Sequence, residues 1–165
     1  MTDAFVAAAL EILDSAIADF RSAIDGGTSE ALNWRPAGED TNSIAVLTVH
    51  ALHSTRSWLS VATGAALPER DRPSEFHATV PEARALLATV DAFAGDCRRI
   101  LETSSVTDWG AARATHARPS ADASPADASS AVTVAWALLH ALEHLREHAG
   151  QVLLTRQLWE QSARG

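Results

Sequence analysis

Apolar residues recur every three to five positions in four long segments of the chain, and this periodicity predicts four amphipathic α-helices. Gly26-Gly27 ends the first segment, and Asn42-Ser43 supplies an N-cap signal for the second. In the third segment Pro81 is expected at the first helical position, which proline favours. The four predicted helices cover approximately residues 2–24, 42–64, 80–101 and 131–161.

One of the three connections between these segments is much longer than the other two. Residues 104–130 separate the third and fourth predicted helices, and the centre of this segment consists of small and polar residues with two prolines. We expect a long, flexible surface loop there and no pair of strands anywhere in the chain. Amphipathic helices in one small domain must bury their apolar faces against each other. The sequence therefore predicts a single all-α domain over residues 1–165, a four-helix bundle with a long crossover between helices 3 and 4.

Histidines are the residues of this pattern that can carry chemistry. His140, His144 and His148 follow each other at intervals of four in the fourth predicted helix, and His50 and His53 lie in the second. Helical residues four apart share a face, with Cβ atoms about 5–6 Å apart, so two such imidazoles can bind one metal ion. Each step of four also rotates by about 40° around the helix. Periodicity alone therefore does not choose among the three histidines of the fourth helix, or between the two of the second.

Composition excludes several classes of function. The net charge of −8 and the absence of a basic cluster argue against nucleic-acid binding. All 13 basic residues are arginine and tyrosine is absent, which removes Schiff-base and phenolic acid–base chemistry. The single cysteine, Cys97, cannot form an internal disulfide and is expected to be inert packing. Without a signal-peptide pattern or an apolar run of roughly 20 residues, the chain is expected to be cytoplasmic and to bind no membrane.

Three motifs follow each other along the chain. They are Asn33-Trp34-Arg35-Pro36 ahead of a helix that reads Ser43-Ile44-Ala45-Val46-Leu47-Thr48-Val49-His50, Trp58-Leu59 one to two turns later, and His144-x3-His148-x-Gly150-Gln151 with Arg156 beyond. In their order and spacing these motifs resemble the DinB-like superfamily, which includes thiol-dependent S-transferases and isomerases of the bacillithiol and mycothiol type. The number and order of the predicted helices also agree with that family.

The resemblance implies that His50, His144 and His148 are the metal ligands and that His53 and His140 are neighbours. Three neutral imidazoles leave coordination positions open, as catalytic sites do. The family implies zinc or nickel as the ion, a low-molecular-weight thiol as a possible co-substrate, a small-molecule substrate and a homodimer. We therefore expect a metal-dependent enzyme of the thiol S-transferase, isomerase or hydrolase type. The alternative is a non-catalytic metal-binding or stress-related dimeric bundle.

Residues beside the histidines lead to further expectations. Gln151 lies three residues after His148 and can hydrogen-bond a ligand ring. Glu143 and Glu147 face about 100° away from their histidine neighbours and are expected in solvent. Gly150 is expected to permit close helix packing. Arg156 either meets an anionic substrate or is an exposed helix arginine.

Overall fold

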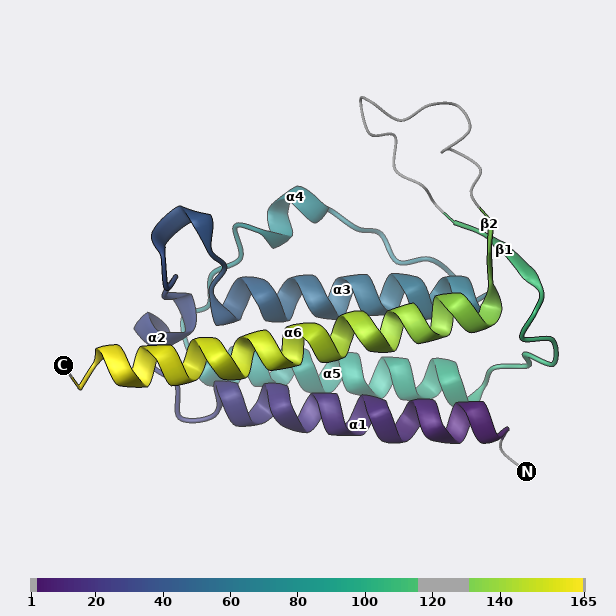
Figure 1. Cartoon of the computed structure of the whole chain (residues 1–165), viewed down its shortest axis with the longest axis horizontal. Helices are drawn as coiled ribbons and strands as arrows, with labels where there is room; N and C mark the ends of the chain where they lie inside the picture. The colour runs from purple at the N-terminus through teal and green to yellow at the C-terminus, as the bar shows by residue number, and fades with distance from the viewer. Residues whose placement is uncertain (1–2, 116–130, 165) are drawn as a thin grey trace.

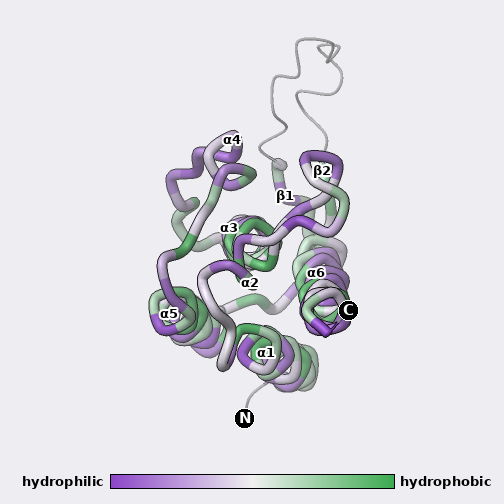
Figure 2. Tube along the Cα trace, turned by 90° about the vertical axis from the view of Figure 1, so that its left-hand side faces the viewer, coloured by the Kyte–Doolittle hydropathy of each residue, from purple (hydrophilic) through white to green (hydrophobic). Residues whose placement is uncertain are grey.

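The computed structural model describes residues 3–115 and 131–164, and four long helices form its body (Figure 1). The apolar sides of these helices turn toward a shared interior, as the view along the bundle shows (Figure 2). The predicted all-α, four-helix-bundle fold is therefore confirmed. The four helices are α1 (Ala4–Ile24), α3 (Ile44–Thr63), α5 (Ala83–Glu102) and α6 (Val134–Ser162).

Short elements lie between the long helices, and most of them were not anticipated. They are α2 (Ser29–Asn33), a 3₁₀ turn (Gly38–Asp40), α4 (Arg72–Glu75), β1 (Ala112–Ala114) and β2 (Ala131–Thr133). The two strands pair antiparallel, so the expectation of no strand pair was wrong. Strands of three residues are too short to show an alternating pattern, and this pairing joins segments far apart in the sequence. Residues 116–130, the centre of the predicted loop, lie outside the described residues.

Local signals set the ends of the helices. The Ser43 hydroxyl accepts a hydrogen bond from the backbone N–H of Val46 at 3.2 Å and caps α3, as the sequence predicts. At the other end of α3, Gly64 has a φ of 77°, a left-handed conformation that glycine adopts without strain. Pro81 does not stand at the first helical position. It precedes the N-cap Glu82, because α5 begins only at Ala83.

The directions of the long helices determine where the connections between them run. Helices α1 and α6 run one way along the bundle, and α3 and α5 run the other way (Figure 1). The connection from α3 to α5 therefore returns along the bundle, and it carries α4 over α3 (Figure 2). Helix α5 ends and α6 begins at the same end of the bundle. Helix α6 packs mainly against α3 and α1.

The core consists of aliphatic and aromatic side chains from all four long helices. Not every large apolar side chain of these helices belongs to the core: Phe5 of α1 is 59% exposed and Leu139 of α6 is 62% exposed. Cys97 is buried among apolar side chains, and burial raises the pKa of its thiol to about 12, so it is inert packing as expected. The largest fully buried apolar side chains are Leu13, Ile17, Phe20, Ile24, Leu32, Ile44, Leu52, Leu59, Leu86, Leu101 and Leu145.

Within the described ranges, no helix combines the length and hydropathy needed to cross a bilayer.

Candidate metal centre

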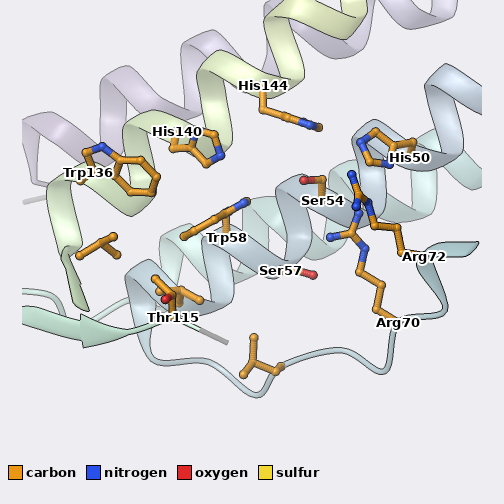
Figure 3. A pocket seen from close by; sticks show the side chains of 13 residues that line it. His50, Ser54, Ser57, Trp58, Arg70, Arg72, Thr115, Trp136, His140 and His144 are labelled. Carbon is orange, nitrogen blue, oxygen red and sulfur yellow. The ribbon is translucent and has the colours of Figure 1, made fainter. Parts of the chain in front are cut away.

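Three histidines converge between α3 and α6. His50 projects from α3, and His144 and His148 project from successive turns of α6. One ring nitrogen from each lies within 4.8 Å of the other two. The ring centroids of His144 and His148 are 4.5 Å apart, and each lies 5.2 Å from that of His50. Figure 3 shows His50 and His144 facing each other across the gap between the two helices.

His50 is held in place by a buried carboxylate. Its Nδ1 lies 2.9 Å from Oε2 of Glu75, a side chain that is 1% exposed. Arg70 donates to the same carboxylate from Nε at 2.6 Å and from Nη2 at 2.9 Å. Because a carboxylate accepts, the proton of His50 is placed on Nδ1, and the lone pair of Nε2 is left for a ligand. This is the carboxylate–histidine arrangement typical of metal sites.

Glu75 is ionised and forms an ion pair with Arg70. Burial by itself would raise the pKa of the Glu75 carboxyl, but the hydrogen bonds from Arg70 and then His50 outweigh it and lower this pKa. Glu75 is therefore ionised near neutral pH. Sequence reasoning missed this residue because it lies in a four-residue helix within a proline-containing connection. The signal that could have found that helix is Asp71, an N-cap whose carboxylate accepts from Ser74 N, followed by Pro73.

His148 has a similar partner on its own helix. Its Nδ1 lies 2.7 Å from Oε1 of Gln151, the contact that the spacing of three residues predicts. The amide nitrogen of Gln151 in turn donates to Glu147 at 3.2 Å, which orients the amide oxygen toward the imidazole. The proton of His148 is thereby placed on Nδ1, and Nε2 is left as an acceptor. Two of the three rings thus have a fixed tautomer suited to metal binding.

His144 differs from the other two in its surroundings. Its Nδ1 is buried and has no hydrogen-bond partner among the described residues. Burial, with the neighbouring His148 and His50 adding to it, lowers the pKa of His144 to about 4. Burial also lowers the pKa of His50, although the hydrogen bond to Glu75 offsets part of this shift. Both imidazoles are therefore neutral at pH 7, which is the form that binds metal. The donor set and its protonation fit a divalent transition-metal ion.

The remaining histidines of the described chain lie outside this cluster. His53 is half exposed, and its Nδ1 lies 3.4 Å from Oε1 of Glu75. His140 stacks on Trp136, with ring centroids 4.7 Å apart, and meets the edge of Trp58 at 4.8 Å. His77 is exposed. His116, which the sequence places in a connection, lies outside the described residues.

Three further expectations have mixed outcomes. Glu143 and Glu147 are exposed, as predicted. Gly150 is exposed and a Cβ there would meet nothing within 4 Å, so the expectation that it permits close packing was wrong. The close approach occurs at Gly27, where a Cβ would lie 2.8 Å from Nη1 of Arg156. Arg156 is partly buried and donates from Nε to Glu160 at 2.7 Å, so it is not an exposed helix arginine. Its Nη1 is buried and has no hydrogen-bond partner among the described residues.

A cleft of about 520 Å³ adjoins the histidine cluster, a size that suits a small-molecule ligand (Figure 3). It runs from His50 and His144 along α3 and the first turns of α6. Trp58 and Trp136 line it on one side, and Ser54 and Ser57 lie between these aromatic rings and His50. A ligand in this cleft would have direct access to the histidine cluster.

The fold and the cluster define a class of protein: a four-helix bundle with a three-histidine site, suited to a metal ion, between two of its helices. A sequence model described as the DinB superfamily matches residues 12–152, so this chain belongs to that superfamily. A solved structure titled "Crystal structure of the conserved protein of locus from Enterococcus faecalis" is similar, with a TM-score of 0.70. The two are 18% identical over 96% of this chain and 97% of the other, a likeness that shows the fold alone. No curated protein matches the sequence.

The lowered pKa of His144 predicts how the stability of the metal-free protein depends on pH. The folded protein keeps this imidazole neutral down to a pKa of about 4, whereas the unfolded chain takes up the proton near pH 6.5. The unfolded state therefore binds more protons between these values, and the free energy of unfolding falls as the pH drops through this window. Urea unfolding with a chelator at pH 7 and pH 5 measures the effect.

Two variants separate this effect from general acid destabilisation. His144→Asn is expected to reduce the loss of stability between pH 7 and pH 5. His77→Asn is the matched control, because His77 is exposed, and it should lose as much stability as the parent protein. An equal pH dependence in the His144 variant and the parent would contradict the assignment.

Proposed function

We propose that this protein is a metal-dependent enzyme that binds zinc or nickel through His50, His144 and His148. One observation carries the proposal: three imidazoles from two helices converge, and Glu75 and Gln151 fix the tautomer of two of them. A buried polar nitrogen is unfavourable unless a hydrogen bond or another ligand compensates for its desolvation, and Nδ1 of His144 has no such partner among the described residues.

His50, His144 and His148 would hold a divalent ion and leave it able to bind a further ligand. The ion would supply Lewis-acid chemistry, which lowers the pKa of a water or a thiol. The protein residues orient the site: Glu75 and Gln151 direct two imidazoles inward, and the cleft admits a small-molecule substrate beside them. Glu143 and Glu147 are exposed to solvent, so we assign neither of them the role of general base.

A thiol nucleophile would have to come from a co-substrate. Cys97 is the single cysteine of the sequence, and it is buried with a raised pKa. A buried neutral thiol is a poor nucleophile. A reaction that uses a thiol would therefore take it from a low-molecular-weight co-substrate. Membership of the DinB superfamily is the ground on which we propose an S-transferase, isomerase or hydrolase reaction of the thiol-dependent type.

Metal content followed by turnover tests the proposal. Protein purified without a histidine tag or chelator is expected to contain close to one divalent ion per chain by elemental analysis. The metal-loaded protein, incubated with a panel of low-molecular-weight thiols and electrophiles, is expected to consume thiol faster than its chelated form does. Failure to bind zinc or nickel at micromolar concentration would contradict the metal site. Metal binding without turnover would favour the alternative of a non-catalytic metal-binding bundle.

A homodimer and a cytoplasmic location also remain part of this proposal. Sedimentation velocity at several protein concentrations measures the first, with a dimer expected at micromolar concentration. Fractionation of the source cells measures the second.

A further inference from the structure

The cleft beside the histidines has an uneven distribution of charge. The protein as a whole carries a net charge of −8, yet the charged side chains that line the cleft are Arg70 and Arg72, and no carboxylate among the described residues lines it. Both arginines extend from the connection between α3 and α5 toward His50 (Figure 3). A cleft of this charge favours an anion over a neutral or cationic ligand.

The two arginines differ in how their charges are compensated. Arg70 donates from Nε and Nη2 to Glu75 and is 18% exposed, so its charge is paired within the protein. Arg72 has no carboxylate partner among the described residues. Its guanidinium lies over the ring of Phe76, 5.4 Å from the centroid, and Phe76 packs against His50 at 4.9 Å. Arg72 thus presents an unpaired, oriented cation beside the histidine cluster.

The remainder of the cleft is apolar and aromatic. The ring of Trp136 is 5.3 Å from that of Trp58, and Val61 and Leu67 continue this surface away from the histidines. Trp136 is 47% exposed and Leu67 is 42% exposed, so both present apolar surface to a ligand in the cleft. The charged and apolar parts lie at different places along one cleft, with the histidines adjoining it (Figure 3).

From this arrangement we propose that the substrate is an organic anion with an apolar body. Its carboxylate or similar acidic group pairs with Arg72, and its apolar part lies against Trp58 and Trp136. The guanidinium offers paired N–H donors to such a group. A molecule bound in this way occupies the space beside His50 and His144. The proposal deepens the proposed function by naming a substrate class, but the binding itself requires only the cleft.

A pair of probes of matched shape tests the charge requirement. Isothermal titration calorimetry of the chelated protein compares 1-naphthoate with neutral 1-naphthylmethanol, so that no metal ion contributes to anion binding. We expect the dissociation constant of naphthoate to be at least about tenfold lower, as a charge-assisted hydrogen bond allows. Equal affinities, or no binding of either probe at millimolar concentration, would overturn the proposal.

Variants with matched controls locate the site. Arg72→Gln is expected to reduce naphthoate binding to the level of naphthylmethanol, whereas Arg84→Gln, at an 87% exposed side chain on α5, should leave it unchanged. Trp136→Ala is expected to weaken both probes by roughly fivefold or more, and Leu139→Ala, an exposed α6 residue, should weaken neither. Retention of naphthoate affinity in Arg72→Gln would overturn the proposal.

These outcomes are independent of the metal. If the chelated protein binds naphthoate through Arg72 but takes up neither zinc nor nickel, the proposed function fails and the anion site stands. If metal binds and both probes bind equally, the anion site fails and the metal centre stands. Both measurements can be made on the same preparation.

Discussion

Replacing His144 with alanine is expected to weaken zinc or nickel binding on the order of a hundredfold. The free energy of structural zinc binding, about 10–16 kcal/mol over four ligands, corresponds to roughly 3 kcal/mol for each ligand. The ring of His144 lies 5.2 Å from that of His50 and 4.5 Å from that of His148, and its Nδ1 has no hydrogen-bond partner among the described residues. Competition titration against a chelator of known affinity measures the change in the dissociation constant.

His140 provides a matched control for this experiment. It is a histidine about one helical turn from His144, but it does not belong to the cluster. His140→Ala is expected to change the metal affinity by less than about threefold, since substitutions away from the ligands and their partners have small effects. A loss in His140→Ala equal to that in His144→Ala would assign the site to a different pair of α6 residues.

Replacing Glu75 with alanine is expected to destabilise the metal-free protein by about 3–5 kcal/mol, the range for removing one partner of a buried ion pair. Glu75 is 1% exposed, and its removal leaves the partly buried guanidinium of Arg70 and Nδ1 of His50 without their acceptor. Urea unfolding in the presence of a chelator measures this change without a contribution from bound metal.

The surface pair of Arg98 and Asp14 is the control for the Glu75 substitution. Its Arg98 Nη2–Asp14 Oδ1 distance of 2.6 Å equals the shortest Arg70–Glu75 distance, but its side chains are 43% and 56% exposed. Asp14→Ala is therefore expected to be much less destabilising than Glu75→Ala, because exposed ion pairs contribute little to stability. If Glu75→Ala were no more destabilising than Asp14→Ala, the buried network would not be a structural support of the site.

A conservative change separates the effect of Glu75 on the fold from its effect on the metal. Glu75→Gln retains an oxygen that can accept from His50 but lacks the negative charge. We expect it to fold and to bind metal about 10–100-fold more weakly than the parent, the range for partners of metal-ligating histidines. The same competition titration measures it, and unchanged affinity would show that the charge of Glu75 does not act on His50.

Local patterns in the sequence were sufficient for the fold class. Each long helix has its own apolar period and its own end signals, such as Ser43 and Gly64, and these depend on residues close together in the chain. The contact between His148 and Gln151 could also be predicted, because both belong to one helix. The choice of His144 and His148 over His140 came from the family resemblance, since a shared helical face includes all three.

The elements that the sequence did not reveal depend on contacts between distant segments. The strands β1 and β2 are defined only by each other, and α4 has no period of its own because it is four residues long. Glu75 contacts His50 from 25 residues away, a distance in sequence that no local pattern reports. Arg72 is likewise part of the cleft only because the connection between α3 and α5 returns over α3.

The histidine spacing that stood out in the sequence thus determined one half of the candidate site. Intervals of four place His144 and His148 on the same side of α6 whatever the rest of the chain does, since helix geometry alone fixes that relation. The tertiary structure decided the other half: it set His50 against them, placed Glu75 behind His50, and put Arg72 and the two tryptophans along the adjoining cleft. Those relations arise from the packing of α6 on α3 and from the path of α4, and packing is a property of the whole chain rather than of any one segment.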